Sequence, residues 1–233
     1  MNKLKIGGLG ILIMFFSLGA MAQTKIQNMP EHDSKPYYFG LTFGFNYSTF
    51  RTTPTKSFAD HDTFLRVQSG WRPGFNVGIM GNLRLSSFID LRFIPALVFA
   101  EKAIDVWVPN QAEPTQNSIE SIYMQLPLQL KFKSDRLNNF RFYGLLGSKL
   151  DYDLAANARS RRSDEWLRVR PIDVGAELGI GFEFFYPNFI FSPEIKISQG
   201  FLNEHFKDSD IPLSNTLDRI TTRMIVISIH IEG

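Results

Sequence analysis

Histidines and acidic residues are the first candidates for chemistry in this sequence of 233 residues. The four histidines are His32, His61, His205 and His230. Two of them stand beside acids, in the runs Asp60–Asp62 and Glu204-His205, and such fragments occur in metal and catalytic sites. No two histidines have the spacing of zinc ligands, and no serine is placed with a histidine and an acid. We therefore interpret the histidines at 61 and 205 as polar loop residues.

Two further patterns could carry a function. Asp151 and Asp153 lie two apart on a predicted strand, so both carboxylates point the same way and could form an acid–base pair. Nearby lysines and arginines favour an ion-pair cluster instead. The run Arg159–Arg162 could bind lipopolysaccharide phosphates or an acidic partner, although a solvated loop is the simpler interpretation. The absence of Cys excludes a disulfide framework, a zinc–cysteine site, an iron–sulfur cluster and a cysteine nucleophile. The lack of a long basic run argues against a nucleic-acid partner. We predict a non-enzymatic protein with no cofactor, no small-molecule substrate and no nucleic-acid partner.

The first 22 residues have the pattern of a secretory signal peptide. Lys3 and Lys5 precede an apolar run over Ile6–Leu18, and Ala20–Ala22 supplies the small residues that a signal peptidase reads. We predict cleavage between Ala22 and Gln23. The apolar run of about 13 residues is too short to cross ~30 Å of hydrocarbon. Removal of the two lysines lowers Lys+Arg from 25 to 23, equal to the 23 Asp+Glu, so the mature chain is formally neutral.

A period of two dominates the rest of the chain. From Tyr37 to Tyr47 every second residue is large and apolar, and the residues between them are mostly small or polar. The same two-faced pattern recurs over residues 71–85, 89–102, 122–133, 140–153, 172–184, 189–198 and 225–231. Eight two-faced strands, joined by longer loops at one end and short turns at the other, are typical of an outer-membrane barrel.

Residue size decides which face of these strands points outward. The apolar faces carry much of the chain's 22 Phe, far more aromatic volume than the interior of a closed eight-strand barrel can hold. The opposite faces are rich in Gly, Asn and Ser, which suit a crowded interior. A soluble β-sandwich is the alternative. We predict an all-β fold, an eight-stranded antiparallel up-and-down transmembrane β-barrel with a side-chain-filled lumen.

The polar faces carry charges of both signs, and closure of the sheet would bring them together. We predict an ion-pair network in the lumen that comprises Arg72, Arg84, Arg92, Lys131, Arg141, Lys149, Asp151, Asp173, Glu177, Glu183 and Glu194. Aromatic residues at the strand ends predict two interfacial belts, which comprise Tyr37, Tyr47, Trp71, Phe99, Trp107, Phe140, Tyr152, Phe184, Tyr186 and Phe189. Pro95, Pro127 and Pro193 fall within strands and remove ladder donors, so we expect β-bulges there.

The chain resembles the PorT family of Bacteroidetes outer-membrane proteins. The resemblance is carried by the segments Arg92–Trp107, Leu126–Gly147, Lys149–Ala156, Asp173–Phe201 and Leu217–Glu232. It extends over nearly the whole mature chain and includes the three prolines. It implies an integral component of the type IX secretion system, which exports cargo proteins bearing a C-terminal domain and serves motility in gliding species. The family has no established catalytic residues to transfer.

These inferences together define the expected organisation. Residues 1–22 are a cleaved signal peptide, 23–36 a periplasmic leader, and 37–233 the outer-membrane barrel, with both termini periplasmic. A barrel this small cannot pass folded cargo, so we expect it to act through outer-membrane lipid and other secretion-system proteins, with the leader and loops exposed for contact. The alternatives are a structural or adhesive barrel that uses its outer loops, and a lipid-modifying enzyme, against which the scattered histidines argue.

Overall fold

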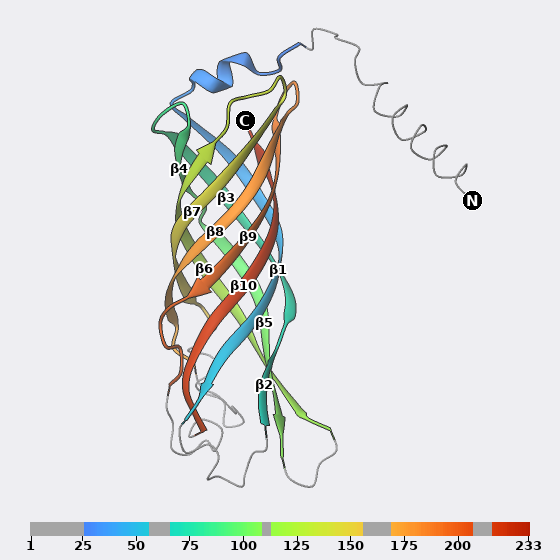
Figure 1. Ribbon diagram of the computed structural model, residues 1–233, viewed down its shortest axis with the longest axis vertical. Helices are drawn as coiled ribbons and strands as arrows, with labels where there is room; N and C mark the ends of the chain where they lie inside the picture. Colours follow the sequence, from blue (N-terminus) through green and yellow to red (C-terminus); the bar gives the residue numbers. More distant parts are fainter. Residues whose placement is uncertain (1–25, 56–65, 109–112, 156–168, 207–215) are drawn as a thin grey trace, which may run out of the picture.

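A computed structural model describes residues 26–55, 66–108, 113–155, 169–206 and 216–233 (Figure 1). The predicted signal peptide, with Ala22 and Gln23, lies outside these residues. His61 with its flanking acids and the run Arg159–Arg162 also lie outside them.

One antiparallel sheet makes up the body of the protein, preceded by the short 3-10 helix η1 (Pro30–Ser34). Its strands are β1 (Tyr37–Pro54), β2 (Arg66–Gly70), β3 (Arg72–Arg84), β4 (Ile89–Phe93), β5 (Ala96–Trp107), β6 (Thr115–Lys133), β7 (Phe140–Asp153), β8 (Ile172–Phe185), β9 (Ile190–Gly200) and β10 (Leu217–Glu232). Only Trp71 separates β2 from β3, and only Ile94 and Pro95 separate β4 from β5, so each of these pairs crosses the barrel as one strand. β1 pairs with both β10 and β3, which closes an eight-strand ring and confirms the predicted barrel.

The mid-strand prolines leave the register of the sheet unchanged. β3 keeps one register against β4 and β5 on both sides of Pro95, and the β6–β7 and β9–β10 ladders run unshifted through Pro127 and Pro193. Our prediction of bulges at these residues was wrong. Each proline lacks only its own donor, while its carbonyl can still pair: Ile79 N donates to Pro95 O at 3.2 Å and Ile94 N to Pro127 O at 3.4 Å.

The two ends of the barrel differ in the length of their connections. Residues 85–88, 134–139 and 186–189 form the short-turn end, where η1 and the end of β10 also lie (Figure 1). At the other end, which we call the long-loop end, more residues separate one strand from the next: 55–65, 108–114, 154–171 and 201–216. This alternation agrees with the sequence prediction and is the usual arrangement of an outer-membrane barrel.

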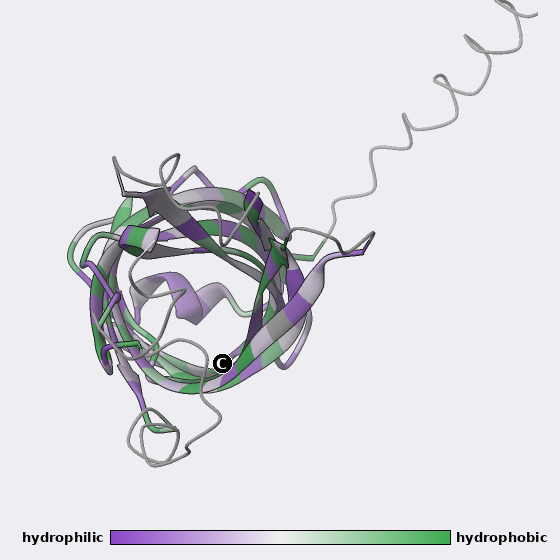
Figure 2. Cartoon of the chain, turned by 90° about the horizontal axis from the view of Figure 1, so that it is seen from below, coloured by the Kyte–Doolittle hydropathy of each residue, from purple (hydrophilic) through white to green (hydrophobic). Residues whose placement is uncertain are grey.

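The part of the barrel nearer the short-turn end is apolar outside and polar inside. In β1 the outward residues from Tyr37 to Tyr47 are 49–73% exposed, whereas Thr42 and Asn46 face inward and are buried. This outward run of about 11 residues has the length that a tilted strand needs to cross the hydrocarbon layer. Seen along the axis, the sheet closes on itself and η1 lies across its far end (Figure 2).

The part of the barrel nearer the long-loop end reverses this polarity. Past Tyr47 the strands continue toward the long-loop end and enclose an apolar cluster of Phe50, Ile104, Val106, Ile119, Leu217 and Ile220. The outward residues at this level include exposed Arg51, Arg66 and Glu120. A protein in water has this distribution, so this part of the barrel is built to stand outside the lipid-facing band, on the side of the long-loop end. We call this part of the barrel, around Phe50, Ile104, Val106, Ile119, Leu217 and Ile220, the extension. Sequence alternation did not predict it, because the period of two is the same in both parts of the barrel.

Candidate functional site: the polar interior and its N-terminal plug

A central ion-pair cluster fills the interior of the lipid-facing part. Arg92 Nη1 lies 2.7 Å from Glu194 Oε2, and both side chains are 0% exposed. Arg92 Nη2 and Lys131 Nζ each lie 3.7 Å from a carboxylate oxygen of Glu232, and Lys131 also pairs with Glu183. Buried charges are stable only when they are paired. These five residues come from β4, β6, β8, β9 and β10, so the cluster exists only once the sheet has closed.

Tyr143 joins the two cations of the central cluster. Its hydroxyl donates to Glu194 Oε2 at 2.8 Å, and its ring lies 4.3 Å from Lys131 Nζ and 5.1 Å from the Arg92 guanidinium carbon. Gly181 on the neighbouring strand makes this possible, since a Cβ at that position would lie 2.4 Å from the tyrosine ring. Sequence reasoning missed Tyr143 and Glu232, although both lie on the inward face that the alternation predicts.

A second group of polar contacts lies nearer the long-loop end. Lys149 Nζ is 2.5 Å from Asp151 Oδ2, and Lys196 Nζ is 3.1 Å from Glu177 Oε1. Asp173 accepts a hydrogen bond from Leu202 N at 3.2 Å. The carboxylates predicted for the lumen at 151, 173 and 177 are all buried here. Asp153, the second member of the possible acid–base pair, instead accepts a hydrogen bond from Ala155 N at 2.9 Å.

Lys102 anchors the segment that follows β9. Its side chain is fully buried, and Nζ lies 3.1 Å from Thr222 Oγ1 and 4.0 Å from Glu204 Oε2. The ring of Phe50 lies 4.9 Å from the same ammonium. Glu204 and His205 are both buried. In this run, which resembles part of a catalytic site, the glutamate points into the barrel and pairs with Lys102.

Arg72 and Arg84 do not join the central cluster. Arg72 Nε lies 3.8 Å from Glu101 Oε1, and both side chains are about one-third exposed. Its assignment to the lumen network was therefore wrong; the register against β5 shifts by one residue between β2 and β3, which displaces the arginine. Arg84 Nη2 donates to the backbone oxygen of His32 at 3.0 Å at the mouth of the barrel.

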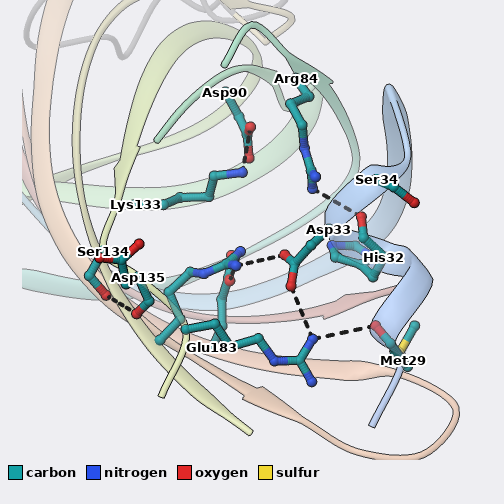
Figure 3. A network of polar contacts seen from close by, with 12 residues as sticks. Met29, His32, Asp33, Ser34, Arg84, Asp90, Lys133, Ser134, Asp135 and Glu183 are labelled. Carbon is teal, nitrogen blue, oxygen red and sulfur yellow. Dashed lines mark hydrogen bonds and ion pairs between the residues drawn. The ribbon is translucent and has the colours of Figure 1, made fainter. Parts of the chain in front are cut away.

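Residues 26–36 close the short-turn end, and we call this segment the N-terminal plug (Figure 3). Asp33 Oδ1 lies 2.6 Å from Arg141 Nη2, and Asp33 Oδ2 lies 3.3 Å from Arg136 Nη1. Arg141 Nη1 is also 3.4 Å from Glu183 Oε2, so the plug is linked to the central cluster. Burial raises the pKa of Asp33, but the hydrogen bond and charge of Arg141, together with Arg136, outweigh it and hold the pKa below its usual value.

His32 is the buried residue of the plug. Its ring packs edge-on against Tyr38 at 4.5 Å and Phe185 at 5.9 Å between centroids. Burial lowers the pKa of His32 from 6.5 to about 4, against the opposing effect of nearby acids, so the ring is neutral near pH 7. The leader was predicted to be exposed for partners. Within residues 26–36 only His32 is buried in the barrel mouth, and most of the others, Glu31 and Lys35 among them, are exposed. Contact of this segment with partners therefore stays a prediction.

Most aromatic residues assigned to the belts lie at the two edges of the lipid-facing band. Phe140 and Phe184 are paired across β7 and β8, and the rings of Tyr186 and Phe189 stack 5.0 Å apart at the short-turn end, where Tyr37 also lies. The opposite edge holds Tyr47, Trp71, Phe99 and Tyr152. Trp107 stands far beyond Phe99 on β5, under the Arg66 guanidinium at 5.0 Å. Its assignment to a belt was therefore wrong, because it belongs to the polar extension.

Within the described ranges, no group of three or more His, Asp or Glu side chains is arranged to hold a metal ion. No helix in the same part of the chain has the length and apolar character needed to cross a membrane.

Comparison with known proteins gives the family. Residues 21–205 match the outer membrane protein beta-barrel domain family. The chain belongs to this family. It is an integral outer-membrane β-barrel protein, as the sequence predicted.

Three solved structures illustrate the range of similar barrels. OprG from Pseudomonas aeruginosa is 14% identical with a TM-score of 0.47, over 84% of this chain and 93% of its own. Neisserial surface protein A is 11% identical with a TM-score of 0.43, over 84% and 96%. Ail of Yersinia pestis is 12% identical with a TM-score of 0.38, over 85% and 100%. No curated protein matches the chain in sequence.

Proposed function

We propose that this protein is a non-enzymatic, integral outer-membrane component of the type IX secretion machinery, similar to the PorT family. In this role it supports export of cargo with a C-terminal domain and, in a gliding host, motility. The sequence resemblance to the PorT family, from Tyr37 to Glu232, supports the assignment to this machinery. The observation that carries the mode of action is the filled interior: the central ion-pair cluster and the N-terminal plug occupy the barrel.

A filled barrel acts by contact and not as a conduit. Eight strands leave room only for side chains or one small ligand, and buried ion pairs from five strands could not separate without leaving charges unpaired. The proposed partners are therefore outer-membrane lipid and other proteins of the machinery. In the orientation we propose, the short-turn end, with the plug and both termini, faces the periplasm, and the extension faces outward.

A clean deletion of the gene tests this role. Cargo with a C-terminal domain should accumulate in the periplasm, and the wild-type gene should restore export. A deletion strain that exports such cargo normally would rule the proposal out. Pull-down from outer membranes in mild detergent, followed by mass spectrometry, should recover other machinery proteins, with an unrelated barrel of similar size as the control.

A surface-contact role is the second candidate, and the extension favours it. The apolar cluster around Phe50 and Ile220 holds the strands together above the lipid-facing band, which carries the long-loop end away from the membrane. Under this alternative, shortening the segment 156–168 abolishes binding to a surface ligand and leaves cargo export intact. The first candidate predicts that export, and not surface binding, depends on the protein.

A further inference from the structure

An apolar groove of about 610 Å³ lies on the lipid-facing side of the barrel, across β10, β1, β3 and β4. Gly81 creates it. This outward glycine is paired with Phe39 on one side and with Phe93 on the other, so a position without a side chain lies between two rings. Pro95 and Ile231 extend the lining along the wall.

The groove lies within the band that acyl chains surround. Phe39 and Phe93 are 65% and 43% exposed on the outward face, and the other outward lining residues are also apolar. A chain in a groove contacts the protein on several sides, whereas a chain on a flat wall contacts it on one. Because dispersion contacts add up, the groove should hold an acyl chain more strongly than the rest of the barrel surface.

A second hollow lies nearer the short-turn end than the groove. Its volume is about 400 Å³, and Phe39 lines both hollows. The second hollow is also lined by Lys35, Pro36, Tyr37, Tyr38 and Gly233. Lys35 is exposed, and no acid of the described residues forms an ion pair with its ammonium. A lysine at the edge of an apolar groove provides a point charge for a phosphate.

We propose that this surface binds one phospholipid, with an acyl chain in the groove between Phe39 and Phe93 and the phosphate at Lys35. The order of the two hollows along the wall matches the order of tail and headgroup in a membrane leaflet. The attraction of one basic residue for an anionic headgroup adds about 1 kcal/mol near a membrane surface. This inference is independent of the secretion role, since it rests on the outer wall alone.

Filling the groove is the direct test. A Cβ on Gly81 would lie 3.7 Å from the Phe39 ring, an ordinary contact, so a side chain can start at this position without a clash, and Gly81→Leu adds apolar volume in the groove. Gly144 provides the matched control: it also faces outward, on β7, and a Cβ there would meet only Gly179 O at 3.9 Å. Gly144→Leu therefore adds the same side chain to a different wall. Gly81→Ala is the milder second variant if the leucine prevents folding.

Native mass spectrometry of the full chain in mild detergent, titrated with dioleoylphosphatidylglycerol, gives the readout. The wild type and Gly144→Leu should each retain one tightly bound lipid, while Gly81→Leu should bind at least tenfold more weakly. Lys35→Gln should weaken this lipid about fivefold, as expected for the loss of about 1 kcal/mol. The same variant should leave binding of dioleoylglycerol, which has no phosphate, unchanged.

Two outcomes would overturn the proposal. Equal lipid affinity in the wild type and the folded Gly81→Leu variant would show that the groove holds no lipid. A wild-type dimer that Gly81→Leu converts to a monomer, without any change in lipid binding, would show that a second copy occupies the groove. If Lys35→Gln weakens both lipids equally, Lys35 does not hold the phosphate and that part of the assignment fails.

Discussion

Asp33 and Arg141 form an ion pair of 2.6 Å between residues 108 positions apart in the sequence. The aspartate belongs to η1 and the arginine is the second residue of β7, so the pair attaches the start of the described chain to the barrel wall. Arg136 pairs with the second carboxylate oxygen of Asp33, and Arg141 also pairs with Glu183. The N-terminal plug is therefore connected to the ion-pair network of the barrel interior.

Loss of the Asp33 carboxylate should loosen the plug. Asp33→Asn removes two ion pairs from a side chain that is 31% exposed, so we expect a loss of about 1 kcal/mol, smaller than for a buried charged hydrogen bond. Because the chain has no Cys, a spin label at Ile26→Cys reports plug mobility. Its spectrum should show a mobile fraction about fivefold larger. Glu31→Gln, on the exposed side of η1, is the control and should leave the spectrum unchanged.

Docking of the plug should weaken at low pH because of His32. The folded-state pKa of about 4 lies below the ordinary 6.5, so a released plug binds a proton that the docked plug does not. Docking is therefore fully stable above pH 6.5 and weakens progressively between pH 6.5 and 4, by up to about 3 kcal/mol. Asp33, with its lowered pKa, continues this loss at still lower pH.

The label at residue 26 measures this dependence directly. In the wild type its mobile fraction should rise as the pH falls from 6.5 to 4. His32→Phe keeps a ring against Tyr38 and Phe185 but cannot titrate, so its mobile fraction should stay constant over the same interval. A wild-type curve that is flat, or one that the phenylalanine variant reproduces, would contradict this mechanism.

Removing one partner from the central cluster should cost more than removing both. Arg92→Ala leaves Glu194 and Glu232 buried with one cation fewer, and we expect a loss of about 3–5 kcal/mol in the free energy of unfolding. Arg92→Met combined with Glu194→Leu should recover much of that loss, because no unpaired charge remains at this contact. Urea unfolding in micelles, followed by the gel shift of folded barrels, measures both; exposed Arg51→Ala is the control.

The apolar interior of the extension should behave as the core of a soluble protein. Ile220 is fully buried in the cluster with Phe50 and Ile104, so Ile220→Ala should destabilise the extension by about 2–4 kcal/mol. The neighbouring Arg219 is exposed, and Arg219→Ala should change stability by less than about 0.5 kcal/mol. Hydrogen exchange at the ends of β1 and β10 measures the local effect, and equal effects in the two variants would refute the assignment.

The filled interior should block ion flow. In planar bilayers the wild type should give no steady conductance, and deletion of residues 26–36 should not create one, since the central cluster and the apolar cluster still occupy the bore. A stable open channel in either protein would contradict the proposed contact-based role. A porin reconstituted in parallel confirms that insertion and detection work.

Much of the barrel could be predicted from local patterns. Alternation along β1 identifies Phe39 and Phe43 as outward and Thr42 as inward, because a strand projects successive side chains to opposite faces. The same rule placed Arg92, Lys131 and Glu194 on the inward face. It failed at Arg72, where a one-residue register shift displaces the side chain. At Trp107 alternation gave the correct outward face, but it could not show that the strand continues past the lipid-facing band.

The sequence by itself predicted the class of fold: the period of two, the turn spacing and the excess of Phe on one face favour a closed sheet with lipid outside over a soluble sandwich. Only the tertiary structure decided which charges meet. Arg92 with Glu194, Asp33 with Arg141 and Lys102 with Glu204 are each joined by closure of the ring or by a segment folding back into it. Such pairings depend on strand order, stagger and distance across the barrel, and alternation along one strand carries no information about any of them.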